Sequence, residues 1–166
     1  MDTETDPGKD AAHTARWLEP EEQRAWRTHL DASRLLMHQL EKDLQPFGLT
    51  LNDYEILVNL SESDEHRMRM SDLATATLQS KSRLSHQITR MENAGLVRRE
   101  HCDTDKRGLF AVLTDHGWDT MRRVAPHHVE SVRRHFIDLL TPASLAALRS
   151  SLSPVVERLR AARGRA

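Results

Sequence analysis

The chain has 166 residues, with 24 lysines and arginines against 25 aspartates and glutamates, and its formal net charge is −1 at pH 7. This length fits one domain, with or without an extended dimerisation arm, and the aromatic content of 4% favours a helical protein over a β-sandwich. No apolar run approaches the roughly 18 residues of a membrane-spanning helix, no signal-peptide pattern opens the chain, and a single cysteine excludes an intrachain disulfide. We therefore expect a cytoplasmic protein that does not interact with membranes.

The near-zero net charge conceals an uneven distribution. Residues 1–22 carry two basic and seven acidic side chains, whereas residues 79–108 carry seven basic and four acidic ones. For contact with a nucleic acid, the local distribution matters more than the sum. The second stretch is therefore a candidate for contact with a polyanion.

The N-terminal part of the chain predicts a tail and one long helix. Residues 1–15 are acidic and poor in apolar side chains, which is typical of a disordered tail. Residues 16–48 contain a helix that begins with Pro20 at its first position and runs to about Leu44. Its ~25 residues span roughly 38 Å, which is long for a small domain. Because such a helix needs more apolar surface than its own fold supplies, we predict an N-terminal dimerisation helix covered by a partner subunit.

Residues 49–114 predict a compact unit of short elements. Residues 50–60 are expected to form a helix that Thr50 or Asn52 caps. A polar linker follows, and residues 67–69 favour a short strand that adds an edge to a later hairpin.

A helix, a turn and a second helix are predicted next. Ser71 can cap the short first helix, and residues 79–81 form the turn. Ser80 or Ser82 then caps the second helix, which covers about residues 80–94 and ends before Gly95, a residue suited to the left-handed position after a helix. Its apolar side chains recur at helical spacing and form one stripe, Leu84, Ile88 and Met91.

Outside that stripe the second helix is almost entirely polar, and Glu92 is its single acidic residue. A solvated helix normally mixes acids with bases, whereas these side chains can reach base edges and phosphates in a DNA major groove. His86 and Gln87 are the strongest candidates for contacts with bases. The alternatives are a solvated face or a helix that binds another protein. The candidate DNA-binding residues of this helix are Ser80, Lys81, Ser82, Arg83, Ser85, His86, Gln87 and Arg90.

Residues 97–113 predict a β-hairpin, the wing, whose polar turn carries Lys106 and Arg107 at its tip. An arginine at such a tip suits insertion into a narrow, electronegative minor groove, and Lys106 suits contact with a phosphate. Asp103 and Asp105 can structure the wing by orienting the Arg107 guanidinium. A plain surface ion pair between Arg107 and either aspartate is the alternative.

Residues 115–163 are expected to form C-terminal dimerisation helices. One helix begins after Thr114 and contains Pro126, which predicts a kink. Thr141 caps a last helix, in which Pro154 predicts a bend or a break. Long helices at both ends, with the polar helix and wing between them, indicate a homodimer whose terminal helices interdigitate.

The central stretch resembles the MarR family of bacterial transcription regulators. The resemblance rests on Leu73-Ala74, on residues 90–99, on the Asp-Thr-Asp-Lys-Arg motif at 103–107 and on Leu113-Thr114. It implies a mainly α fold with a small β-hairpin wing, in which a winged helix-turn-helix lies between long N- and C-terminal dimerisation helices. A two-fold dimer of this kind presents two reading helices about 34–36 Å apart to double-stranded DNA, so its operator is expected to be an inverted repeat.

The resemblance also implies a small-molecule effector. Members of the family commonly bind small aromatic acids between the dimerisation helices and the reading lobe. By this fold-level analogy, an effector such as an aromatic acid is expected here. The residues that could line its site are Trp26, Arg27, His38, Tyr54 and His128.

Other chemistries find little support in the sequence. No catalytic constellation or phosphate-binding loop stands out, so we expect no enzymatic activity and no cofactor. The ten histidines show no H-x-x-x-H spacing, and no metal site is predicted; a polar cluster at a domain junction is the simpler interpretation. Cys102 lies near Glu100 and Asp103, which disfavour a thiolate, and is interpreted as a small strand residue.

Together these patterns predict a dimeric, sequence-specific DNA-binding regulator of transcription, an effector-responsive repressor at an inverted-repeat operator. The alternative is a winged-helix module that binds protein and has no DNA-binding activity.

Overall fold

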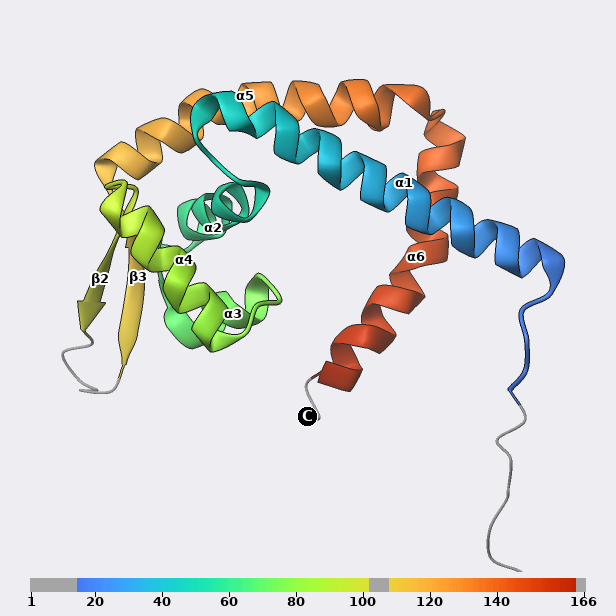
Figure 1. Ribbon diagram of the computed structural model, residues 1–166, viewed down its shortest axis with the longest axis horizontal. Coiled ribbons are helices and arrows are strands. Elements are labelled where there is room, and N and C mark those ends of the chain that lie inside the picture. Colours follow the sequence, from blue (N-terminus) through green and yellow to red (C-terminus); the bar gives the residue numbers. More distant parts are fainter. Residues whose placement is uncertain (1–14, 102–107, 164–166) are drawn as a thin grey trace, which may run out of the picture. The chain divides into compact units, whose positions relative to one another are not determined.

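The computed structural model describes residues 15–101 and 108–163 of the chain (Figure 1). Five residues with predicted roles lie outside the described residues, namely Cys102, Asp103, Asp105, Lys106 and Arg107. The same is true of residues 1–14 of the predicted tail. The chain divides into two compact units, Met1–Arg34 and Leu35–Ala166. No helix in the described ranges is long and apolar enough to cross a membrane.

The first helix, α1 (Pro20–Leu44), has the boundaries that the sequence predicts. Pro20 stands at its first position, where the missing N–H group has no helical partner to lose, and the two glutamates of the first turn interact favourably with the helix dipole. Of its 25 residues, only Leu40 and Leu44 are buried. Apolar side chains elsewhere on the helix are exposed, including 52% of Trp26 and 69% of Leu35.

The core lies in the second unit, around α2 (Leu51–Glu62). The Asp53 N–H donates to Thr50 Oγ1 at 3.1 Å, and the Thr50 N–H donates to Asp53 Oδ2 at 2.9 Å, which is a capping box. The predicted cap is therefore confirmed for Thr50. Fully buried side chains around this helix come from several elements of the unit: Leu44, Ile56, Leu57, Leu60, Leu73, Leu84, Ile88, Val97, Ala111 and Val124.

Three short strands form an antiparallel sheet in the order β1 (Arg67–Arg69), β3 (Leu109–Leu113), β2 (Val97–His101). Arg69 pairs with Phe110, and Arg99 pairs with Ala111. Strands β2 and β3 lie side by side in Figure 1 as the two arms of a hairpin. The predicted wing strands and the predicted edge strand are both confirmed.

Helix α3 (Met70–Ala76) follows β1 without a loop. The predicted cap at Ser71 is wrong, because Arg69 occupies the N-cap position and makes no side-chain capping bond. Ser71 lies one position inside the helix, and its hydroxyl donates to Asp72 Oδ1 at 3.1 Å. The strand runs straight into the helix, so no linker residue is left to act as a cap.

Helix α4 (Lys81–Asn93) begins and ends close to the predicted positions. The Arg83 N–H donates to Ser80 Oγ at 3.3 Å, which confirms Ser80 as the cap. Gly95 follows the helix with φ +71°, the left-handed conformation that glycine adopts at low cost. In the turn before α4, Leu78 also has a left-handed φ of 56°.

Helix α5 (Asp115–His135) begins with a capping bond from the Gly117 N–H to Thr114 Oγ1 at 3.0 Å. It contributes Val124 to the core, and it continues through Pro126 to His135. Gly117 lies close to Leu96, the residue just before β2, and a Cβ on Gly117 would stand 2.0 Å from the Leu96 carbonyl oxygen.

The last helix, α6 (Pro142–Arg163), is capped by Thr141, whose Oγ1 accepts from the Ser144 N–H at 3.1 Å. It continues through Pro154, so the break that this proline could have caused is not found. None of its 22 residues is buried. Three short 3₁₀ helices complete the described chain: Gln45–Phe47, Asp64–His66 and Ile137–Leu139.

Candidate nucleic-acid interface

Helix α4 presents an apolar face to the core and a polar face to solvent. Leu84, Ile88 and Met91 are at most 1% exposed, as the apolar stripe predicts. The opposite face carries exposed side chains that can donate or accept hydrogen bonds, Thr89 among them, and it holds most of the predicted DNA-binding residues: Lys81, Ser82, Arg83, Ser85, His86 and Arg90. Thr89 was not among the predicted residues, although its spacing from Ser82 and Ser85 places it on the same face.

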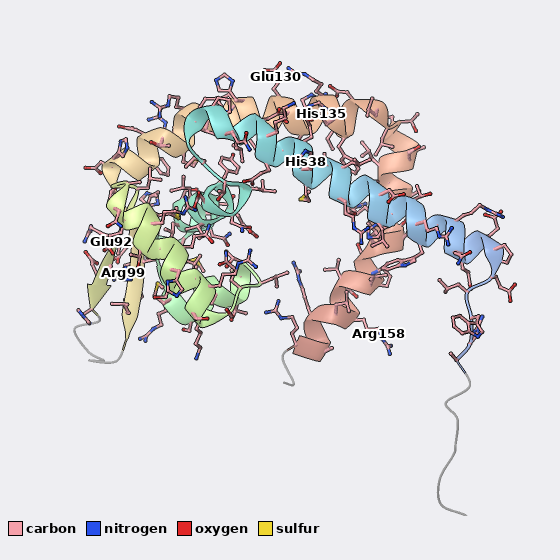
Figure 2. All side chains as sticks on the ribbon, in the orientation of Figure 1. His38, Glu92, Arg99, Glu130, His135 and Arg158 are labelled. Atoms are coloured by element: carbon pink, nitrogen blue, oxygen red, sulfur yellow. The ribbon has the colours of Figure 1, made fainter. Side chains whose placement is uncertain are left out.

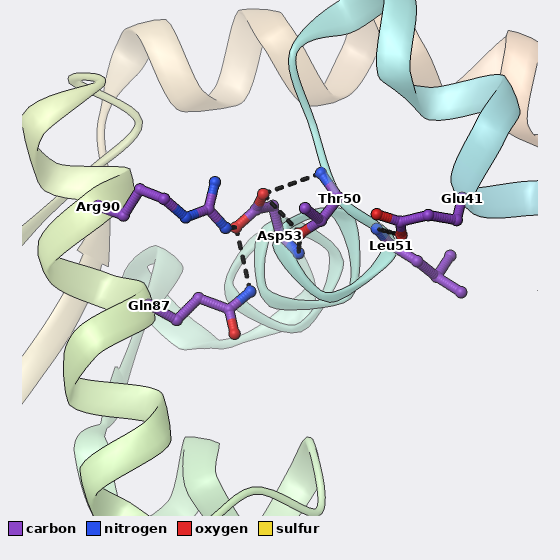
Figure 3. Close-up of polar contacts among 6 residues, drawn as sticks. All are labelled: Glu41, Thr50, Leu51, Asp53, Gln87 and Arg90. Carbon is purple, nitrogen blue, oxygen red and sulfur yellow. Dashed lines mark hydrogen bonds and ion pairs between the residues drawn. The ribbon is translucent and has the colours of Figure 1, made fainter. Parts of the chain in front are cut away.

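Two of the predicted DNA-binding residues, Gln87 and Arg90, contact a carboxylate on another helix. Gln87 Nε2 donates to Asp53 Oδ1 at 3.0 Å, and Arg90 Nη2 lies 2.5 Å from the same oxygen. Figure 3 shows both side chains reaching from α4 toward the start of α2, where Thr50 and Asp53 form the capping box. Contact of Gln87 and Arg90 with DNA stays a prediction, and the structure gives them a second role in holding α4 against α2.

The Asp53 carboxylate is wholly buried, with 0% of the residue exposed. Burial alone raises the pKa of a carboxyl group, but hydrogen bonds from Arg90, Thr50 and Gln87 outweigh it, and the pKa of Asp53 lies below its ordinary value. Asp53 is therefore ionised at neutral pH and serves as the common acceptor for two elements. The sequence pattern did not identify Asp53 as this acceptor, because neighbouring residues reveal only its position near a helix cap and not its contacts with α4.

A second arginine, Arg99, connects α4 to the wing through hydrogen bonds. Arg99 on β2 donates from Nη1 to Glu92 Oε2 at 2.5 Å, and from Nη2 to the Ser85 carbonyl oxygen at 2.8 Å and Thr89 Oγ1 at 2.9 Å. Its N–H also donates to Glu92 Oε1 at 2.9 Å. Figure 2 labels Arg99 and Glu92 at this junction. Arg99 thus fixes the direction in which β2 leaves the helix, a role that sequence reasoning missed.

The edge strand β1 adds a basic surface beside the wing. The guanidinium carbons of Arg67 and Arg69 each lie 5.2 Å from the centroid of the Phe110 ring on β3. The two arginines are two residues apart, so they share one face of the sheet. Arg67 also pairs with Glu65 at 2.6 Å. This basic surface lies at the β1 edge of the sheet.

The predicted effector residues are only partly brought together. The rings of Tyr54 and His128 are in contact, with centroids 4.3 Å apart and planes tilted by 43°, and His128 Nδ1 is buried without a partner among the described residues. Burial lowers the pKa of His128 and raises the pKa of Tyr54. His38 is exposed on α1, and Trp26 and Arg27 belong to the unit Met1–Arg34. An effector site formed by all five residues stays a prediction.

The described residues hold no group of three or more His, Cys, Asp or Glu side chains placed to bind a metal ion. The fold is that of a winged helix-turn-helix protein, since the polar helix α4 lies beside a small antiparallel sheet that forms the wing. Residues 47–108 match the sequence profile of the MarR family.

Solved structures support this assignment over most of the chain. AbsC, a MarR family transcriptional regulator from Streptomyces coelicolor, is 75% identical, with a TM-score of 0.86 over 89% of this chain and 99% of that one. Sco3205, a MarR family regulator from the same organism solved in complex with DNA, is 44% identical, with a TM-score of 0.85 over 89% of this chain and 92% of that one. The chain belongs to the MarR family of transcriptional regulators.

A curated relative is more distant. The transcriptional regulator PecS of Dickeya dadantii (strain 3937) is 30% identical over 113 residues, which span 68% of this chain and 66% of PecS. The match thus falls just short of two thirds of the PecS sequence.

Proposed function

We propose that this chain acts as a homodimer that represses transcription by binding an inverted-repeat operator, and that a small-molecule effector releases it. The observation that carries the proposal is the exposed polar face of α4, which Asp53 and Arg99 hold from two sides beside the wing. Such a face can place His86, Ser82 and Ser85 against base edges in a major groove. The DNA complex of Sco3205, a relative 44% identical, supports the same use of the fold.

Dimerisation is supported by apolar side chains that the chain leaves uncovered at both ends. On the N-terminal segment, Trp17 is 85% and Trp26 52% exposed, and on α6 Leu159 is 62% exposed. Large exposed apolar side chains on long helices are typical of surfaces that a second subunit covers. A two-fold dimer presents two recognition helices about one DNA turn apart, which is why the operator is proposed to be an inverted repeat.

The effector is proposed to bind beside Tyr54 and His128, where the buried Nδ1 of His128 offers a hydrogen-bonding group that the described chain does not use. The dimer can adopt conformations that differ in the spacing of the two recognition helices. A ligand that binds one of these conformations more tightly than the others shifts the dimer toward it. A spacing that mismatches successive major grooves would release the operator.

The decisive experiment is fluorescence anisotropy of the full-length protein on its own upstream intergenic DNA and on scrambled DNA, at two salt concentrations. We expect tighter binding to the upstream DNA and a steep loss of affinity with salt, because phosphate contacts release counterions. Arg107→Ala is expected to weaken operator binding by about 1–3 kcal/mol with the fold intact. Equal binding of both DNAs contradicts sequence-specific binding to the upstream DNA. No binding at either salt concentration favours the alternative, a winged-helix module that binds protein.

A further inference from the structure

A cavity of about 310 Å³ opens between β1, α3, α4 and the start of β3. Its polar lining consists of Arg69 on β1, Ser71 on α3, and Lys81 and Ser85 on α4, and the described lining also includes Met70, Gly108 and Leu109. Arg69 and Ser71 are close in sequence, but Lys81 and Ser85 on α4 join them only through the tertiary fold, so local sequence patterns do not reveal the cavity.

The described lining is cationic and rich in hydroxyl groups. Arg69 and Lys81 supply two positive charges, Ser71 and Ser85 supply two hydroxyls, and none of the described lining residues is acidic. Asp72 lies next to the cavity and accepts a hydrogen bond from the Ser71 hydroxyl at 3.1 Å. This combination of cations and hydroxyl donors suits an anion with several acceptor oxygens.

The arginine of this lining is held in place by its neighbours in the sheet. Arg69 pairs with Phe110 in the register of β1 and β3, and its guanidinium carbon lies 5.2 Å from the Phe110 ring centroid. The aromatic face stabilises the cation and limits its rotation. Lys81 is the first residue of α4, at the end of the helix where unpaired N–H groups and the helix dipole favour a negative charge.

We propose that this cavity, here called the phosphate seat, holds one phosphodiester of the DNA backbone between the major groove that α4 enters and the minor groove beside the wing. The proposal rests on the DNA-binding function proposed above. Neighbouring grooves of a duplex are separated by one sugar–phosphate strand, so a protein that reaches both must accommodate that strand. The phosphate seat lies between α4 and the beginning of β3, and the proposal places the separating strand there.

A phosphate held there sets the register of the protein on the duplex without reading sequence. Loss of the contact is therefore expected to weaken binding to all sequences by a similar factor. This behaviour separates Lys81 from His86 and Ser82, whose loss is expected to change the preference between sequences.

The test uses full-length Lys81→Ala and Arg69→Met, with Lys42→Ala on α1 and Arg123→Met on α5 as controls that make the same charge changes at exposed positions. Each variant is titrated with the operator that the parent protein footprints, and with operators carrying one uncharged methylphosphonate at each backbone position in turn. Thermal melts establish that the variants are folded.

We expect Lys81→Ala and Arg69→Met each to weaken operator binding about 5- to 10-fold and to reduce the salt slope by about one, while the controls match the parent. In the parent, one methylphosphonate position per half-site should cost about 10-fold. In Lys81→Ala the same substitution should cost less than about 2-fold, because the contact is already lost.

The phosphate seat is overturned if the two variants bind like their controls, or if every methylphosphonate costs the same factor in Lys81→Ala as in the parent. Failure of the parent itself to prefer its operator would overturn the proposed function and the phosphate seat together. The two failures are thus distinguishable, because only the first leaves sequence-specific binding by the parent intact.

Discussion

Arg90 on α4 and Asp53 at the start of α2 form an ion pair, with Nη2 and Oδ1 2.5 Å apart. The Asp53 side chain is 1% exposed and the Arg90 side chain 54% exposed, so the carboxylate is buried while the guanidinium remains accessible from solvent. The pair joins the recognition helix to a helix that is itself tied to α1, because the Leu51 N–H donates to Glu41 Oε2 at 2.6 Å (Figure 3). The orientation of α4 therefore depends on contacts that reach back to the C-terminal end of α1.

Replacing Asp53 by alanine is expected to lower the free energy of unfolding by about 3 kcal/mol, because it removes the capping box and the buried acceptor that Gln87 and Arg90 share. Chemical denaturation at neutral pH measures this change. Glu55→Ala is the matched control, since Glu55 is an exposed acid on the same helix and its loss should change stability by less than about 0.5 kcal/mol. A loss no larger for Asp53→Ala than for the control would contradict the joining role of Asp53.

Stability is expected to fall in acid through the two carboxylates whose pKa lies below its ordinary value. Hydrogen bonding from Ser131 lowers the pKa of Asp43 despite partial burial, and Arg90, Thr50 and Gln87 lower that of Asp53 against the effect of burial. A carboxylate with a depressed folded-state pKa stabilises the fold above the unfolded value of 3.8, and this contribution disappears as the pH falls through the folded pKa.

The measurement is the melting temperature from neutral pH down to about pH 2.5. Asp53→Asn should flatten the part of the curve below the unfolded pKa, since an amide does not titrate. A parent curve that stays level below that pKa, or one that the substitution does not flatten, would count against a buried, ionised Asp53.

Arg99→Lys is expected to lower the free energy of unfolding by about 1–2 kcal/mol, because an ammonium group cannot span acceptors on Glu92, Ser85 and Thr89 at once. Faster hydrogen exchange of the β2 amides should accompany the loss. The control is Arg98→Lys, since the neighbouring Arg98 pairs only with Glu100 among the described side chains and is half exposed. Equal effects of the two substitutions would show that the Arg99 contacts do not hold the wing.

Leu78→Gly is expected to raise the free energy of unfolding by about 0.5 kcal/mol. Leu78 has φ 56° and is 70% exposed, so glycine removes the strain of a left-handed backbone while little packing is lost. Leu78→Ala keeps the strain and should not stabilise. If alanine stabilises as much as glycine, the gain comes from the exposed side chain and not from the backbone.

Gly117→Ala is expected to cost about 3 kcal/mol or more, because the new Cβ would meet the Leu96 carbonyl oxygen at 2.0 Å and force α5 away from the sheet. Gly48→Ala provides the comparison, since φ is +71° there but nothing lies within 4 Å of the added atom. It should cost only about 1 kcal/mol from backbone strain. Thermal unfolding of the two variants separates steric exclusion from conformational strain.

Local patterns along the chain were sufficient to predict most elements. The Ser80 cap, the stripe of Leu84, Ile88 and Met91, and Gly95 together located α4 to within a residue or so at each end. These signals act over one to three helical turns, because capping and side-chain spacing depend on neighbours in sequence. The same kind of signal misplaced the cap of α3 at Ser71, since pairing of β1 with β3 determines where that helix begins.

The contacts that hold the recognition helix could not be found in this way. Asp53 is 34 residues from Gln87 and 37 from Arg90, and the phosphate seat joins side chains from β1, α3 and α4. Composition and spacing indicated that the α4 side chains are polar and basic, but they carry no information on which of them meet a buried acid. That choice follows from burial of the apolar faces of α2 and α4 against a common core, which brings the start of α2 next to one side of α4 and leaves the other side open to solvent.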